Sequence, residues 1–173
     1  MGEVKIHWQY FPKSSACPDL LHQVVGEFEK VLFEISSLKN VGQVSNAVLA
    51  KLRPGLEVLG FRVEAGKTGE GKIKVPVLFG RNGSVEKAFE ADAFHAFGRV
   101  VLEVEAGRGV SNNQFLKDLF QACVMQGVDY AMIAVRNDYR GADDFSKVVG
   151  FIDTLYASTR LSLPLKGLMI IGY

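Results

Sequence analysis

The stretch FEADAFHAFGRVVLEVEAGRG, residues 89–109, decides the fold that we predict and carries an unusual concentration of charge. It contains two short runs in which apolar and polar residues alternate, joined by a turn of two or four residues centred on Phe97-Gly98. Alternation with a period of two is typical of β-strands, so the stretch predicts a β-hairpin. Four acidic residues lie within its two strands: Glu90, Asp92, Glu103 and Glu105.

An even-length turn fixes which side chains of the two strands face each other. With a turn at Phe97-Gly98, Asp92 faces Glu103 and Glu90 faces Glu105. Because side chains alternate along a strand, all four acids then point to one face of the hairpin. An odd-length turn would send the acids of one strand to the other face. The opposite face of the second strand carries an apolar triplet: Val100, Leu102 and Val104.

The aligned acids have two interpretations, a solvated sheet face or a cation site. Like charges directly opposite each other destabilise a hairpin by roughly 0.2–1 kcal/mol per pair, and burial adds to that cost. No lysine or arginine alternates with the acids on their face. Hard divalent cations such as Mg²⁺ bind carboxylate oxygens, so we favour the cation site. His95 falls on the face opposite Asp92 and is predicted to pack rather than to act as a general base.

The remaining patterns predict an α/β or α+β fold with a central mixed β-sheet flanked by helices. Amphipathic patterns predict helices, and extended apolar runs predict strands. The second helix is expected to stop before Arg53-Pro54, since a residue that precedes proline avoids helical geometry. We expect helices in residues 18–38, 44–52, 111–126 and 143–158, and strands in 56–65, 72–79, 85–94, 99–106, 130–137 and 165–173.

Composition favours a single soluble cytoplasmic domain spanning residues 1–173. The net charge is +1, which gives no global basic field. Two cysteines are too few for a disulfide scaffold and fit a reducing compartment. The first ten residues, MGEVKIHWQY, lack the apolar segment of a secretory signal. No apolar run approaches the roughly 18 residues of a membrane span, so no membrane partner is expected.

Residues 66–73, GKTGEGKI, imitate a phosphate-binding P-loop. The glycine and lysine spacing matches, but Ile73 stands where the magnesium-binding serine or threonine would be. A P-loop also opens a helix, whereas the residues that follow read as a strand. We therefore expect no nucleotide cofactor.

A family resemblance emerges from the acids of the hairpin. Asp92, followed eleven residues later by Glu103-Val104-Glu105, resembles the catalytic pattern of the PD-(D/E)xK, restriction-endonuclease-like superfamily. Glu105 stands in place of the usual lysine, which resembles the BamHI/BglII-like branch with its Glu-x-Glu form. The order of elements over about 18–137 resembles the superfamily's αβββαβ core, with 142–173 as a C-terminal extension.

The resemblance implies a metal-dependent endonuclease that hydrolyses phosphodiester bonds in DNA with Mg²⁺ or Mn²⁺. Asp92 and Glu103 would ligate the metal together with the backbone carbonyl of Val104. Glu105 would either orient the attacking water or hold a second metal ion. Phosphodiester hydrolysis needs a metal to activate water and to neutralise charge on the phosphate, so the chemistry suits these residues.

Further residues have roles that the sequence leaves open. Lys117, on the polar face of the helix after the acids, could replace the missing catalytic lysine or could simply be solvated. Arg108 could hold a phosphate or could be an exposed loop residue. Glu29, Glu34 and Glu90 are candidate additional acids, with solvation as their alternative.

Two other functions compete with the nuclease. Glu105 in place of lysine favours a catalytically inactive nucleic-acid-binding or regulatory protein that retains the nuclease fold. A two-acid carbohydrate enzyme is less favoured, because no aromatic sugar platforms lie near the acids. Enzymes of the branch resembled here are homodimers; the apolar helix expected at 143–158 could form a dimer face or could cover the sheet.

Overall fold

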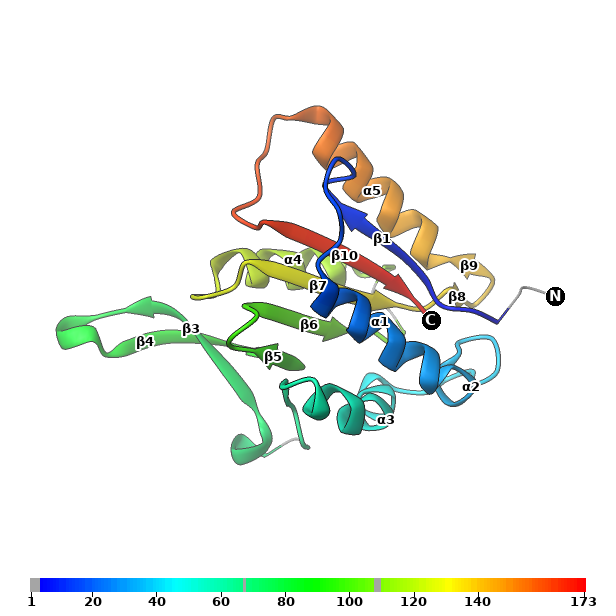
Figure 1. Ribbon diagram of the computed structural model, residues 1–173, viewed down its shortest axis with the longest axis horizontal. Helices are drawn as coiled ribbons and strands as arrows, with labels where there is room; N and C mark the ends of the chain where they lie inside the picture. The colour runs from blue at the N-terminus through cyan, green and yellow to red at the C-terminus, as the bar shows by residue number, and fades with distance from the viewer. Residues whose placement is uncertain (1–3, 67, 108–109) are drawn as a thin grey trace.

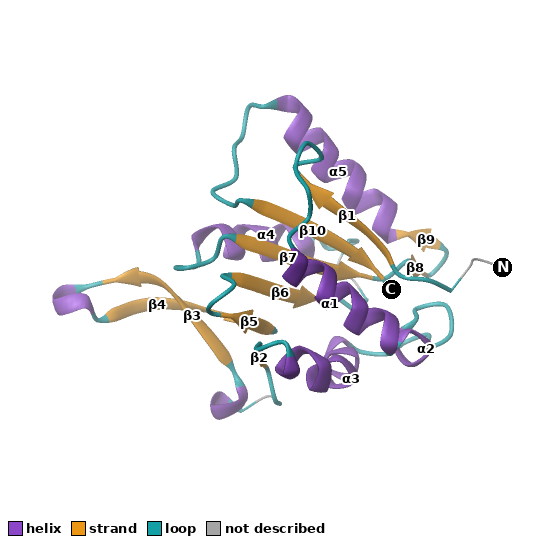
Figure 2. Ribbon diagram, viewed as in Figure 1, coloured by secondary structure: helices purple, strands orange, loops and turns teal. Residues whose placement is uncertain are grey.

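The computed structural model describes residues 4–66, 68–107 and 110–173 and shows a mixed six-stranded sheet between two layers of helices (Figures 1 and 2). The strand order is β1-β10-β7-β6-β5-β2. The sheet strands are β1 (His7–Phe11), β2 (Arg62–Val63), β5 (Ala93–His95), β6 (Val100–Val104), β7 (Tyr130–Val135) and β10 (Gly167–Gly172). The helices are α1 (Asp19–Lys30), α2 (Leu32–Ile35), α3 (Ser45–Val58), α4 (Gln114–Val124) and α5 (Asp144–Ser158).

The sheet is mixed because its centre is parallel and its two sides are antiparallel. β6, β7 and β10 run parallel to one another. β1 pairs antiparallel with β10, while β2, β5 and β6 form an antiparallel series. The parallel strands are buried on both faces and are almost continuously apolar, as such strands are expected to be. The predicted central mixed sheet with flanking helices is confirmed.

Helices cover both faces of this sheet. One face packs against α1 and α3 through residues such as Phe28, Leu52 and Leu102. The other face packs against α4 and α5 through residues such as Leu119, Ile152 and Val101. Successive side chains of β6 point alternately into these two cores, so the side chain of Glu103 points to the face of the sheet on which α4 lies.

The predicted hairpin register is confirmed in the pairs that form. β5 and β6 pair Ala93 with Leu102, Phe94 with Val101 and His95 with Val100 across a turn at residues 96–99. Asp92 directly precedes β5 and is therefore next to Glu103 in this register. The apolar triplet of β6 is buried in the core on the opposite face, as predicted.

One pairing of the hairpin was predicted incorrectly, because the first strand divides at Asp92. Its N-terminal part is β4 (Val85–Ala91), which pairs with β3 (Ile73–Phe79) in a separate two-stranded sheet. Glu90 accordingly lies opposite Lys74 rather than opposite Glu105. Figure 1 shows the β3–β4 hairpin extending away from the body of the molecule.

The α3 region also differs from its prediction. The helix continues through Pro54 to Val58, so the expected stop before Arg53-Pro54 is wrong. Buried Leu52 and Leu56 on either side of the proline hold both halves of the helix against the core. Just beyond the end of the helix, Gly60 has a positive φ of 97°, which permits the amide of Phe61 to donate to the carbonyl of Leu56. Only Arg62–Val63 of the strand expected at 56–65 is extended in the sheet.

The N-terminal and C-terminal segments contribute an edge strand and an interior strand to the sheet. β1 was not predicted; it borders the sheet beside β10. The predicted extension 142–173 is central in space, because β10 lies between β1 and β7 and α5 packs on the sheet. A short antiparallel hairpin, β8 (Asp138–Tyr139) and β9 (Ala142–Asp143), follows β7. Among the described residues, no helix is both long enough and apolar enough to cross a membrane.

Candidate functional site

A polar cavity of about 470 Å³ opens where β4, β5 and β6 meet α4. Its lining includes two lysines, Lys72 and Lys117, and the polar side chain of Gln121. Acidic residues outnumber these lysines three to one, so the cavity carries a strongly negative formal charge. The acids are Glu64, Glu90, Asp92, Glu103, Glu105 and Asp118.

Asp92 is held at the break between β4 and β5. Its Oδ2 accepts a hydrogen bond of 2.7 Å from the backbone amide of Val104, which fixes the carboxyl against the end of β6. Its backbone carbonyl accepts from the amide of Glu64 at 2.7 Å. Burial raises the pKa of Asp92 to about 7, with Glu64 and Glu105 adding repulsion, although the Val104 amide opposes the shift.

Glu103 projects from β6 toward the same cavity. Its carboxyl is hydrogen-bonded by the backbone amide of Asp92, but its Oε1 is buried without a hydrogen-bond partner among the described residues. Burial, and then the charges of Asp92 and Asp118, raise the pKa of Glu103 well above its ordinary value. A buried carboxylate oxygen without a donor is costly, and the described residues supply none for this oxygen.

Asp118 is a site residue that the sequence did not predict. It lies on α4 and is only 3% exposed, and its Oδ2 is a second buried carboxylate oxygen without a partner in the described part of the chain. Burial and the neighbouring Glu105 raise the pKa of Asp118 to about 8, while Lys117 opposes the shift. The signal in the sequence was an acid at a core position, because Asp118 shares the buried stripe of Phe115, Leu119 and Ala122.

Glu64 is the second residue that was missed. It follows β2, is 6% exposed, and forms an ion pair of 2.5 Å with Lys72. Lys72 also contacts the more exposed Glu90 at 3.3 Å. No local sequence pattern indicates Glu64, because β2 joins the site through its pairing with β5, which is remote along the chain. Lys72 is thus shared by Glu64 and Glu90, and it forms no ion pair with Asp92, Glu103 or Asp118 in the described part of the chain.

The other candidate residues separate into those at the cavity and those away from it. Lys117 lines the cavity with an exposed side chain. Glu29 and Glu34 are exposed on the first helical segment and do not line the cavity, and Glu34 instead pairs with Lys51 at 2.6 Å. Arg108 lies outside the described residues. Glu29 and Glu34 are therefore not brought to the site.

His95 has a packing role, as predicted. Its ring lies 5.1 Å from that of Phe61, its Nε2 is 3.0 Å from the carbonyl oxygen of Leu59, and its Nδ1 accepts from the amide of Gly98 at 2.7 Å. Both ring nitrogens are thus engaged in holding the β5–β6 turn against the end of α3.

The donor set of the cavity suits a hard cation, but the side chains are not arranged around one. In residues 4–66, 68–107 and 110–173, no three histidine, cysteine, aspartate or glutamate side chains stand where they could hold a metal ion together. Binding would therefore require carboxyl groups to turn. The chain matches none of the protein-family models with which it was compared, and it has no match among curated protein sequences.

Proposed function

We propose that this protein is a metal-dependent endonuclease of the restriction-endonuclease-like superfamily that hydrolyses phosphodiester bonds in DNA. The observation that carries the proposal is a pair of buried carboxylate oxygens, one on Glu103 and one on Asp118, that have no partner among the described residues, in a cavity that also holds Asp92 and Glu105. Among the described residues of the cavity, two lysines face six acids, which is too little positive charge to make the burial of the acids favourable. A divalent cation would supply that charge.

The chain offers a defined ligand set. Asp92 and Glu103 would hold Mg²⁺ or Mn²⁺ with the backbone carbonyl of Val104, once their carboxyl groups turn toward a common point. When bound, the cation neutralises charge that develops on the phosphate and makes a bound water more acidic. Glu105 would orient the attacking water. In the reaction the water oxygen bonds to phosphorus while the bond to the leaving oxygen breaks; a carboxylate of the cavity takes the water's proton, and the leaving oxygen receives one from solvent.

The arrangement of elements supports the same assignment. The acids are brought together by β2, β5 and β6, an antiparallel series flanked by α3 before it and by α4 and the parallel strand β7 after it. This is the αβββαβ order that the resemblance implies. Glu103 lies at the end of β6 and Glu105 directly follows the strand, where the family pattern has its acid-x-lysine element.

A cation titration tests the metal site separately from catalysis. Millimolar Mg²⁺ or Mn²⁺ should raise the melting temperature of the wild type, because a ligand that binds only the folded state stabilises it by mass action. Glu103→Gln should lose that response and any cleavage of plasmid DNA. Glu86→Gln, at an exposed acid of β4 outside the cavity, is the matched control and should respond like wild type. A wild type that ignores both cations would contradict the proposal.

One observation favours an inactive nucleic-acid-binding or regulatory protein as the second candidate. Glu105 replaces the usual lysine, and Lys117, the candidate substitute, has an exposed side chain at the edge of the cavity. DNA binding with cation-dependent stabilisation but no cleavage in Mg²⁺ or Mn²⁺ would establish this alternative. If Lys117 is the catalytic lysine, Lys117→Met should abolish cleavage and leave the cation response unchanged.

A further inference from the structure

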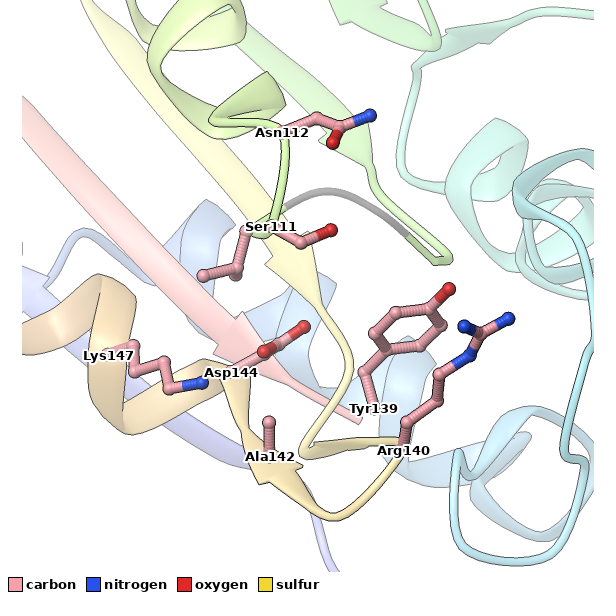
Figure 3. Close-up of a pocket in the computed structure, with 8 residues that line it drawn as sticks. Ser111, Asn112, Tyr139, Arg140, Ala142, Asp144 and Lys147 are labelled. Carbon is pink, nitrogen blue, oxygen red and sulfur yellow. The ribbon is translucent and has the colours of Figure 1, made fainter.

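Two arginines and a tyrosine form a cluster at the end of β7, next to the acidic cavity. The ring of Tyr139 has the guanidinium of Arg136 at 5.4 Å from its centroid and that of Arg140 at 5.3 Å. Figure 3 shows Tyr139 and Arg140 side by side on the wall of a cavity of about 490 Å³, with Lys147 across from them. A second cavity, of about 430 Å³, is lined by Tyr139 and Arg140 as well, and in addition by Arg136.

Arg136 is buried without an ion-pair partner in the part of the chain that the structure describes. Its side chain is only 7% exposed, and it donates hydrogen bonds to the carbonyl oxygen of Gln43 and to the hydroxyl of Tyr173. Within the described residues it forms no ion pair with a carboxylate, although Asp144 lies near enough to feel its charge. Burial of a cation beside neutral acceptors is unfavourable, and an anion in the adjoining cavity would compensate it.

The β8–β9 turn positions the second arginine. Arg140 has φ of 55° and is followed by Gly141 with φ of 79°, so a bulky residue occupies a turn position that favours asparagine or glycine. The turn is held by Asp138, whose Oδ1 accepts from the amide of Gly141 at 3.1 Å. This bond engages one oxygen of Asp138, which lines the same cavity, and the guanidinium of Arg140 is exposed beside the ring of Tyr139.

The cluster is joined to the acidic cavity through Tyr173. Its hydroxyl donates to the backbone carbonyl of Glu105 at 3.0 Å and accepts from Arg136. Ala106 and Gly107, which directly follow Glu105, line the same cavity as Arg136. A DNA strand with one phosphate bound in the acidic cavity would therefore extend to Arg136 and Arg140.

We infer that Arg136, Tyr139 and Arg140 form a subsite that binds the DNA strand beside the phosphate to be cleaved. The guanidiniums hold a neighbouring phosphate, for which their planar donor arrangement is suited, and the Tyr139 ring stacks on a base. The inference rests on the proposed function, since it assigns the substrate strand of the same site.

Binding of a fluorescent single-stranded DNA of about 15 nucleotides, measured by anisotropy in EDTA over a series of salt concentrations, tests the subsite. Tyr139→Ala should weaken binding at least about fivefold because stacking is lost, and Tyr139→Phe should restore it. Arg140→Ala should weaken binding and lower the salt slope by about one, as expected for the loss of one phosphate contact. Arg160→Ala is the control: it removes the same charge beyond the other end of α5 and should bind like wild type.

The outcomes separate the subsite from the proposed function. If Tyr139→Ala and Arg140→Ala bind DNA as tightly as wild type does, the subsite is overturned and the nuclease proposal is left intact. Equal losses in Arg140→Ala and Arg160→Ala would also overturn it, since they would indicate a diffuse charge effect. A wild type that binds no DNA, in EDTA or with calcium, would overturn both proposals.

Discussion

At the residue scale, the main feature is a set of buried carboxyl groups whose charge is only partly offset by backbone amides and by Lys117. Asp92, Glu103 and Asp118 each have a pKa that burial raises, and each is repelled by at least one neighbouring acid. The nearby lysines do not remove the cost, because Lys72 is paired with Glu64 and Glu90 on the outer side. Because these buried acids destabilise the folded protein, we interpret them as part of a binding site and not as groups that stabilise the fold.

The first prediction concerns Asp118→Asn in the metal-free protein. The amide keeps the shape of the carboxyl, removes its charge and can donate to Glu105. At pH 9, above the wild-type pKa of about 8, the variant should be more stable by about 1 kcal/mol, since a buried group without a partner costs on this order. Thermal unfolding should show a melting temperature higher by about 2–4 °C. Glu86→Gln is the control, and a destabilised Asp118→Asn would contradict the interpretation.

The second prediction is the pH dependence of stability without metal. The carboxyl pKa values of Asp92 and Asp118 rise from 3.8 to about 7 and about 8 on folding. Between these limits the folded state holds protons that the unfolded state has released, so the free energy of unfolding falls as pH rises from about 4 to about 8. Urea titrations at several pH values measure this. Asp118→Asn should flatten the upper part of the decline, whereas stability that increases over this window would contradict the assigned shifts.

The site could be predicted only where its residues are neighbours in sequence. Asp92, Glu103 and Glu105 were found because hairpin geometry relates them directly. The signal for Asp118 was weaker, because it consisted only of an acid on the apolar stripe of a helix. Glu64 had no local signal, because only the pairing of β2 with β5 brings it near the other acids. Exposed helical acids such as Glu34 look the same in sequence whether they are solvated or bind a ligand.

At the scale of elements, local patterns predicted the hairpin and the central strands but not their limits. The β5–β6 register follows from alternation and an even turn, both of which are local. The short edge strand β1 has no such pattern, and its position depends on pairing with β10 at the far end of the chain. Tertiary packing also overrode Pro54, because Leu52 and Leu56 bury the helix on both sides of it.

The third prediction is that Pro54→Ala stabilises α3. Pro54 is exposed inside the helix and has no amide to donate to the preceding turn. Alanine restores the hydrogen bond and has a higher helix propensity than proline. It also increases the conformational entropy of the unfolded chain, which offsets part of the gain. We therefore expect the free energy of unfolding to rise by about 1–2 kcal/mol. Chemical denaturation measures the gain, and Glu57→Ala, exposed on the same helix, should change stability by less than about 0.5 kcal/mol. A loss of stability in Pro54→Ala would contradict this prediction.

At the scale of the whole molecule, charge is separated although the net charge is only +1. The acids gather at the ends of β5 and β6, and the Arg136–Arg140 cluster lies beside them at the end of β7. A polyanion that approaches this edge is attracted by the arginines and repelled by the acids. Cation binding to the acids would remove the repulsion, so the two ligands should help each other bind.

The final prediction is a reciprocal coupling between cation and DNA. Calcium shares the preference of magnesium for carboxylate oxygens, and it should tighten binding of a DNA duplex about tenfold, a typical size for coupling between two sites. By linkage, the duplex must tighten calcium binding by the same factor, which calorimetric titration with and without DNA can measure. At a pH at which Glu103 is ionised in the metal-free protein, Glu103→Gln should bind DNA more tightly than wild type in EDTA, because one repelling charge is gone, and it should lose the response to calcium. Glu86→Gln should behave like wild type in both titrations. If calcium leaves the DNA affinity of wild type unchanged and Glu103→Gln binds DNA no better in EDTA, the acids do not face the nucleic acid and the strand must lie elsewhere.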